Sequence, residues 1–137
     1  AVQIRSRANT EGDDSTLTPG TVHGPQVKIA YTRDTGSESG CIFLNSTNGR
    51  PVPLTRCEPH SNFQKRSWNS IRIVAKGPRI QTFVNGKKVD DLTDEEVFEK
   101  YPSGFIGLQV CPTPSTLPNE VTSPLIMWRN LRIKPIQ

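Results

Sequence analysis

The chain has 137 residues, and its 17 lysines and arginines against 13 aspartates and glutamates give a formal charge of +4. This length suits one domain spanning residues 1–137. The apolar fraction is only 33%, and 12 prolines and 10 glycines punctuate the sequence, so short strands and turns are expected and long helices are not. No apolar run could cross a bilayer and residues 1–5 lack signal-peptide features, so any targeting segment is expected outside this sequence.

The first strand is expected over residues 1–7, where two sets of residues alternate. One face would carry Val2, Ile4 and Ser6, and the other would carry Gln3, Arg5 and Arg7. A polar loop follows over residues 9–20. Alternation resumes over residues 26–31, with Gln26 and Lys28 on the polar face. Residues 40–44 form its partner strand, and residues 45–65 an irregular excursion.

The second half predicts a meander of hairpins. Residues 70–76 and 80–84 are paired strands joined at Gly77 and Pro78, and Asn85-Gly86 leads into a short strand over residues 87–89, because both turn residues tolerate positive φ. Residues 93–100 have the capping and charge pattern of one or two helical turns.

The remaining apolar segments, residues 104–110 and 125–133, are expected to be core strands separated by a proline-rich loop. The alternation of the last strand slips near Arg129 and Asn130, as a β-bulge would cause. Trp68 and Trp128 could stack on a sugar ring, but core packing is the favoured interpretation for both. This series of short strands predicts an all-β sandwich.

The distribution of charge and the spacing of the cysteines limit which partners, metal sites and disulfides are expected. The basic residues are scattered from Arg5 to Lys134, so no nucleic-acid partner is expected and an acidic protein partner fits better. Cys41, Cys57 and Cys111 lack the paired spacing of a zinc site. They could form one disulfide in any of three pairings, or remain three unpaired thiols.

Several segments together resemble the DUF1080 family, also described as 3-keto-disaccharide hydrolase or family 16 glycoside-hydrolase-like domains. The segments are VQIRSR at residues 2–7, VHGPQV at 22–27, SGCIF at 39–43, RIVAKG at 72–77, GFIGLQV at 104–110 and WRNLRIK at 128–134. The resemblance implies a concanavalin-like jelly-roll β-sandwich with a sugar site on its concave face, and an exported bacterial protein that is periplasmic or extracellular.

Three departures from the family pattern bear on function. Members have opening strands before the segment that matches Val2, so this sandwich is either trimmed at its N-terminus or completed by another polypeptide. The family's acidic residue after PQV is Lys28 here, and a tyrosine and an acid correspond to Phe43 and Asn45. The predicted polar face is therefore rich in donors and poor in bases, while acids such as Glu38 are expected in solvated loops.

The predicted ligand-binding residues are Gln3, Arg5, Arg7, His23, Gln26, Lys28 and Asn45. Because glycosidic chemistry needs carboxylates or a metal held by them, the favoured function is a non-catalytic accessory or structural subunit of a larger exported assembly. It would dock to other protein subunits through loops and a sheet edge. One alternative is a hydrolase or lyase acting on 3-keto-glycosides, with His23 and Arg5 as catalytic residues. Another is a carbohydrate-binding module, and no metal or cofactor is expected.

Overall fold

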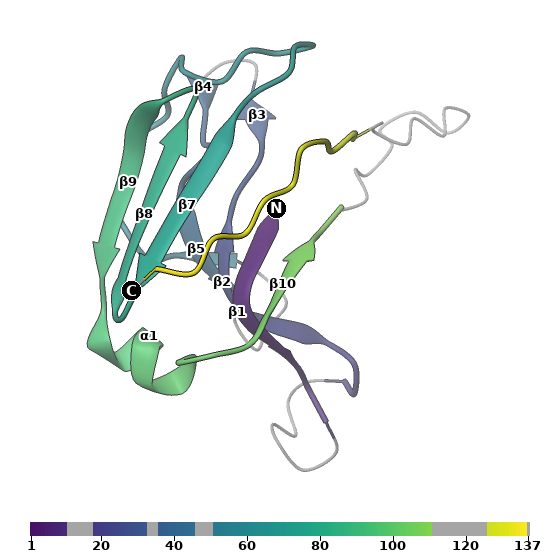
Figure 1. The fold of residues 1–137 in the computed structure, drawn as a ribbon, viewed down its shortest axis with the longest axis vertical. Helices are drawn as coiled ribbons and strands as arrows, with labels where there is room; N and C mark the ends of the chain where they lie inside the picture. Colours follow the sequence, from purple (N-terminus) through teal and green to yellow (C-terminus); the bar gives the residue numbers. More distant parts are fainter. Residues whose placement is uncertain (11–17, 33–35, 46–50, 111–125, 137) are drawn as a thin grey trace.

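The computed structural model describes residues 1–10, 18–32, 36–45, 51–110 and 126–136. A five-stranded antiparallel sheet has the order β10 (Phe105–Leu108), β1 (Val2–Ala8), β2 (Val22–Val27), β5 (Ile42–Asn45) and β6 (Pro51–Pro53). A three-stranded sheet contains β7 (Ile71–Lys76), β8 (Arg79–Val84) and β9 (Lys87–Thr93), and β3 (Tyr31–Thr32) pairs with β4 (Gly36–Ser37). In Figure 1 the three-stranded sheet lies in front of β2 and β5.

The hydrophobic core joins the two larger sheets. Its buried members are Val2, Ile4, Val27 and Ile42 from the five-stranded sheet, with Ile80 and Leu92 from the other. Trp128 packs against this cluster, as expected, together with partly buried residues such as Ile29 and Leu54. The all-β sandwich predicted from the strand pattern is therefore confirmed.

The predicted meander is confirmed. β7 pairs with β8 from Ile71 opposite Val84 to Lys76 opposite Arg79, and the Asn85-Gly86 turn has positive φ at both residues. β9 continues to Thr93, further than predicted, because its residues stay paired with β8 as far as Arg79. The expected helical turns are α1 (Glu95–Lys100), and the Asp94 carboxylate caps its first turn by accepting from the Val97 amide.

A bulge in β1 overturns the predicted assignment of faces. Arg5 has a φ of 50°, and the register of β1 shifts after Gln3 in its pairing with both neighbours. The extra residue exchanges the faces of the residues that follow it. Ser6 Oγ therefore donates to Gln3 Oε1 at 2.9 Å, while the Arg5 guanidinium reaches the Gly77 carbonyl at 2.7 Å.

Two other predicted elements differ from the structure. The strand expected over residues 26–31 is instead β2, which begins at Val22 and ends at Val27. The regular pairing with β5 stops there, because Lys28 donates to the Cys41 carbonyl but accepts from the amide of a different residue, Gly40. The described part of the expected strand at 125–133 joins no ladder of described strands, although Asn130 has the positive φ of an irregular position.

Two predictions of burial were wrong. The strand at 104–110 exists as β10, but Ile106 is 54% exposed because β10 is the edge of its sheet. Trp68 is 48% exposed, and its ring carries the Arg129 guanidinium 4.0 Å from the centroid. The apolar side chains of this edge are consequently on the surface of the described chain.

Cys41 and Cys57 form a disulfide, one of the three pairings that the sequence allowed, and Cys111 lies outside the described residues. The bond fastens the start of β5 to the segment that follows β6. In the described ranges, no helix has the length and apolar character needed to cross a membrane.

Candidate functional site

A chain of four side-chain amides crosses the five-stranded sheet on the face opposite the core. Gln3 Nε2 donates to Gln109 Oε1 at 2.6 Å and to Gln26 Oε1 at 3.0 Å. Gln26 Nε2 donates in turn to Asn45 Oδ1 at 3.3 Å. Alternation places these side chains away from the core, because neighbouring Val2 and Val27 are core residues. We call Gln3, Gln26, Asn45 and Gln109 the amide chain.

The centre of the amide chain is buried and its ends are accessible. Gln3 is 2% exposed and Gln26 is 4% exposed, whereas Asn45 and Gln109 are partly exposed. Amides both donate and accept, so a row of them can satisfy its members without introducing charge. The two buried glutamines therefore hold the partly exposed amides in fixed orientations.

Lys28, Glu38 and Phe43 extend the site along the same face. Phe43 lies opposite Gln26 in the pairing of β2 with β5, and the Lys28 ammonium lies 4.8 Å from the centroid of its ring. The ammonium also forms an ion pair with the Glu38 carboxylate, with about a third of each side chain exposed. An anionic group is therefore present at this face, contrary to the prediction that Glu38 is a solvated loop residue.

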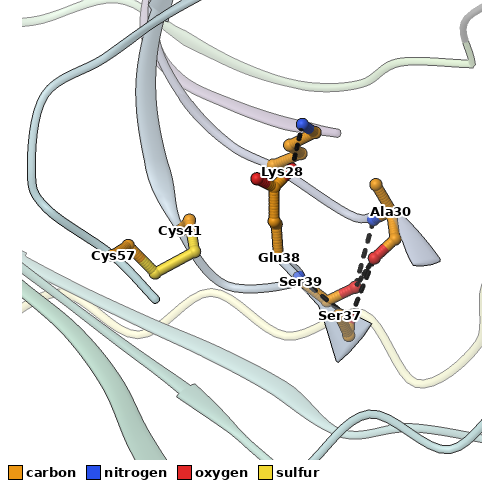
Figure 2. Close-up of polar contacts among 7 residues, drawn as sticks. All are labelled: Lys28, Ala30, Ser37, Glu38, Ser39, Cys41 and Cys57. Carbon is orange, nitrogen blue, oxygen red and sulfur yellow. Dashed lines mark hydrogen bonds and ion pairs between the residues drawn. A yellow bond between two sulfur atoms is a disulfide. The ribbon is translucent and has the colours of Figure 1, made fainter. Parts of the chain in front are cut away.

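The segment that carries Glu38 is held against β2 by backbone and serine contacts. Figure 2 shows Ser37 and Ser39 directing their hydroxyls to Ala30, whose carbonyl accepts from them at 2.8 and 2.9 Å. The Gly40 amide donates to the Lys28 carbonyl, and the disulfide begins at Cys41. These contacts hold the carboxylate in place at the Lys28 ammonium.

Gly40 is required where this segment meets the other sheet. Its φ is 98°, and a Cβ atom there would lie 2.9 Å from the Val84 side chain and 3.1 Å from that of Val89. Only glycine allows this approach without strain or displacement of the core. The backbone conformation next to Glu38 is thus set by packing between the sheets.

His23 is in β2, but its polar contact is with Tyr101 and not with the amide chain. Its Nδ1 lies 3.1 Å from the Tyr101 hydroxyl, and the rings meet edge to face with centroids 5.7 Å apart. Nε2 is buried and has no hydrogen-bond partner among the residues that the structure describes. His23 therefore has no described hydrogen bond to the amide chain, and its predicted role as a ligand or base on the polar face gains no support from its contacts.

The two predicted arginines also lie away from the amide chain. Arg5, on the other side of the bulge, contacts Gly77 and lies with its guanidinium 5.0 Å from the Phe98 ring centroid. Burial lowers the pKa of the Arg5 guanidinium. Arg7 is exposed on β1, in register with His23. Of the seven predicted residues, the structure brings together Gln3, Gln26, Lys28 and Asn45.

A separate hollow of about 350 Å³ lies beside the disulfide and is lined in part by His60, Asp90 and Asp91. Its acids already have partners, because Asp90 accepts from the Ile42 amide and the Thr55 hydroxyl, and Asp91 pairs with Arg79. Within the ranges that the structure covers, no three His, Cys, Asp or Glu residues are arranged to hold a metal ion.

The family model of the 3-keto-alpha-glucoside-1,2-lyase-like domain matches residues 1–134. The chain belongs to this family. No curated protein and no solved structure matches the sequence. The resemblance to the 3-keto-disaccharide hydrolase family that the sequence segments indicated is thereby confirmed.

Within this lyase-like domain, the positions that depart from the family pattern lie together. Lys28 lies over Phe43, and Asn45 follows Phe43 on the same face of β5. Sequence reasoning missed two residues of the site, Glu38, which pairs with Lys28, and Gln109, which accepts from Gln3. Gln109 had a usable signal, since it shares the alternation of Gly107, which is opposite Gln3. Glu38 had none, because its position depends on the turn at 37–41 and not on a strand period.

Proposed function

We propose that the amide chain and the adjoining Lys28–Glu38 pair bind a saccharide. The observation that carries this proposal is the convergence of hydrogen-bonded amides and one ion pair on a single sheet face. Sugar hydroxyls donate and accept in the same way as amides, and a few fixed polar groups are what orient a small ligand. A buried polar row costs free energy unless every member is bonded, and these bonds fix the orientation of the exposed amides.

Exposure separates the contacting residues from those that support them. The side chains of Lys28 and Glu38 are 35% and 31% exposed, and Asn45 is partly exposed, so these three can contact a sugar directly. Gln26 is buried and bonds Asn45 from beneath. We therefore assign Gln26 and Gln3 as positioning residues.

The family supports a 3-keto-glycoside as the saccharide, since the matching model is named for lyase activity on a 3-keto-alpha-glucoside. A carbonyl only accepts hydrogen bonds, and the Lys28 ammonium is a donor suited to it. The Cys41–Cys57 disulfide supports an oxidising compartment, consistent with a periplasmic or extracellular location. An accessory role in a larger exported assembly stays a prediction and is compatible with sugar binding.

The Lys28–Glu38 pair favours a second candidate, elimination across positions 1 and 2 of the bound sugar. In this reaction the Glu38 carboxylate removes the proton at C2, which the neighbouring keto group acidifies. The C2–H electron pair forms the C1–C2 double bond as the C1–O bond breaks. The departing oxygen takes a proton from the Lys28 ammonium, and Glu38 returns the first proton to Lys28. His23 and Arg5 take no part in this step.

Calorimetric titration with methyl 3-keto-α-glucoside and with methyl α-glucoside tests the binding proposal. We expect the keto sugar to bind more tightly, and Asn45→Ala to weaken its binding about tenfold, which corresponds to about 1.4 kcal/mol for a lost hydrogen bond. Lys87→Ala, at the exposed start of β9, is the matched control and should titrate as the wild type does. Release of methanol, followed by NMR, reports elimination, and Glu38→Gln should abolish release while binding persists.

The outcomes are separable. Absence of heat with both sugars, or an Asn45→Ala titration equal to the wild type, would reject sugar binding at this face. Binding without methanol release would reject elimination alone. Methanol release that persists in the Glu38→Gln variant would show that another residue removes the proton.

A further inference from the structure

Exposed apolar side chains concentrate on β10 and on residues 126–136. Nine of the eleven large apolar residues that are exposed in the described chain belong to residues 105–110 and 126–136. Ile106, Leu108 and Val110 are 54%, 42% and 53% exposed, and Met127, Leu131 and Ile133 are 61%, 67% and 77% exposed. We call these six residues the β10 flank. So many exposed apolar side chains on two segments indicate an interaction site.

The backbone of the β10 flank is available for pairing. β10 is an edge strand that pairs only with β1 among the described strands. Antiparallel pairing uses one side of a strand, so the outward N–H and C=O groups of β10 have no ladder partner in the part of the chain that the structure describes. Such an edge accepts an added strand from another polypeptide.

The tail at residues 126–136 is fixed in position although it joins no described ladder. Trp128 packs against the core cluster, and Arg129 stacks on Trp68. Figure 1 shows this tail as an extended trace passing between β7 and β10 in the view. The exposed Leu131 and Ile133 are therefore held by anchored neighbours, and their exposure does not reflect a detached end.

The charge of residues 126–136 indicates what kind of segment could bind at the β10 flank. Residues 126–136 contain Arg129, Arg132 and Lys134 and no acidic residue. Neither Arg132 nor Lys134 forms an ion pair with a described residue. A strand with apolar residues on one face and carboxylates on the other would cover the apolar side chains and pair with these cations.

We propose that the β10 flank docks an extended segment of a partner protein, with alternating apolar and acidic residues, which adds as a strand at the free edge of β10. A second copy of this chain fits less well, because it would bring a second Arg132 and Lys134 toward the first. A lipid surface fits less well too, since it cannot bond the outward backbone groups of β10. The three residues assigned to contact the sugar, Lys28, Glu38 and Asn45, lie on or beside β2 and β5, and β1 separates β2 from β10, so this inference does not depend on sugar binding.

A synthetic peptide of alternating valine and glutamate, blocked at both ends, is the probe, titrated into the full chain. Two matched peptides carry lysine in place of glutamate, or proline in place of every second valine. We expect the glutamate peptide to bind at least tenfold more tightly than either, and to slow amide exchange in β10. Ile106→Lys should weaken binding at least tenfold, whereas Val52→Lys, on the opposite edge strand β6, should have no effect.

Three results would overturn the proposal. The first is failure of the glutamate peptide to bind, or equal binding of the lysine peptide. The second is concentration-dependent dimerisation in sedimentation that Ile106→Lys abolishes, which would assign the surface to a second copy. The third is binding to anionic phosphatidylserine vesicles with unchanged amide exchange in β10, which would assign it to a membrane.

Discussion

Gln26 shows how a single polar side chain can organise the candidate site. It accepts from Gln3 at 3.0 Å and donates to Asn45 at 3.3 Å, although it is only 4% exposed. Replacing it with an apolar residue would remove one acceptor from the buried Gln3 amide and the donor that bonds the partly exposed Asn45. The alternation of β2 makes Gln26 face away from the core, but the partners that use its amide come from two other strands, β1 and β5.

Asp91 provides a pH-dependent test at the residue scale. Its carboxylate accepts from Arg79 at 2.8 Å, Gln81 at 2.9 Å and Lys88 at 3.0 Å, and these bonds, led by that of Arg79, hold its pKa far below the ordinary value of 3.8. This stabilisation is fully present above the pKa of the unfolded aspartate and is lost as the pH falls toward the native pKa. Asp91→Asn should therefore lower the urea midpoint at pH 7, and by less at pH 3. A difference that grows in acid would contradict this assignment.

The bulge in β1 determines which residues reach the site. Arg5 takes the extra position, so Ser6 returns to the face of Gln3 and bonds its side chain. β2 accommodates the bulge with Gly24, whose φ is 133°. A Cβ atom at Gly24 would lie 2.9 Å from Ser6 Cα, so the two strands approach too closely for any side chain there.

Gly24→Ala tests this close approach. We expect a loss of about 2 kcal/mol in the free energy of unfolding, since the substitution combines unfavourable φ with a backbone contact. Gly20→Ala is the matched control, because Gly20 also has positive φ, at 86°, but nothing lies within 4 Å of its added Cβ. Urea denaturation of both variants measures the difference. Equal losses would show that φ alone, and not the contact with Ser6, limits this position.

At the scale of the whole molecule, the two sheets are joined by side-chain packing and by the contacts around the disulfide. Asp90 of β9 accepts from the Ile42 amide and from the Thr55 hydroxyl, and Thr82 of β8 donates to the Gly40 carbonyl at 2.6 Å. The Cys41–Cys57 bond holds Ile42 and Thr55 in one short closed loop. The position of Glu38 in the candidate site therefore depends on contacts between the two sheets.

Removing the disulfide should destabilise the whole fold. The two cysteines are 16 residues apart, and a loop of this size corresponds to about 3 kcal/mol of lost stability in the double variant Cys41→Ala, Cys57→Ala. Thermal and urea unfolding of this variant and of the oxidised wild type measure the effect, with Cys111→Ala as the control that retains the bond. Unchanged midpoints in the double variant would show that packing between the sheets is sufficient.

The sequence by itself determined several strands, the hairpin turn, the helix and the family, because these depend on local patterns. Alternation identified β1 and β8, Asn85-Gly86 fixed the hairpin, and the capping pattern located α1. It also placed Gln3 and Gln26 on a polar face, which the structure supports. These features follow from backbone geometry that neighbouring residues dictate.

Only the tertiary structure decided which residues meet and which segments are covered. The exchange of Arg5 and Ser6 depends on a one-residue bulge, and the pairing of Lys28 with Glu38 depends on a turn closed by the serines and a disulfide. The exposure of Ile106 and Leu131 depends on what lies beside an edge, which an apolar pattern cannot specify. Contacts between distant segments are set by packing and register, and alternation along one strand carries no information about them.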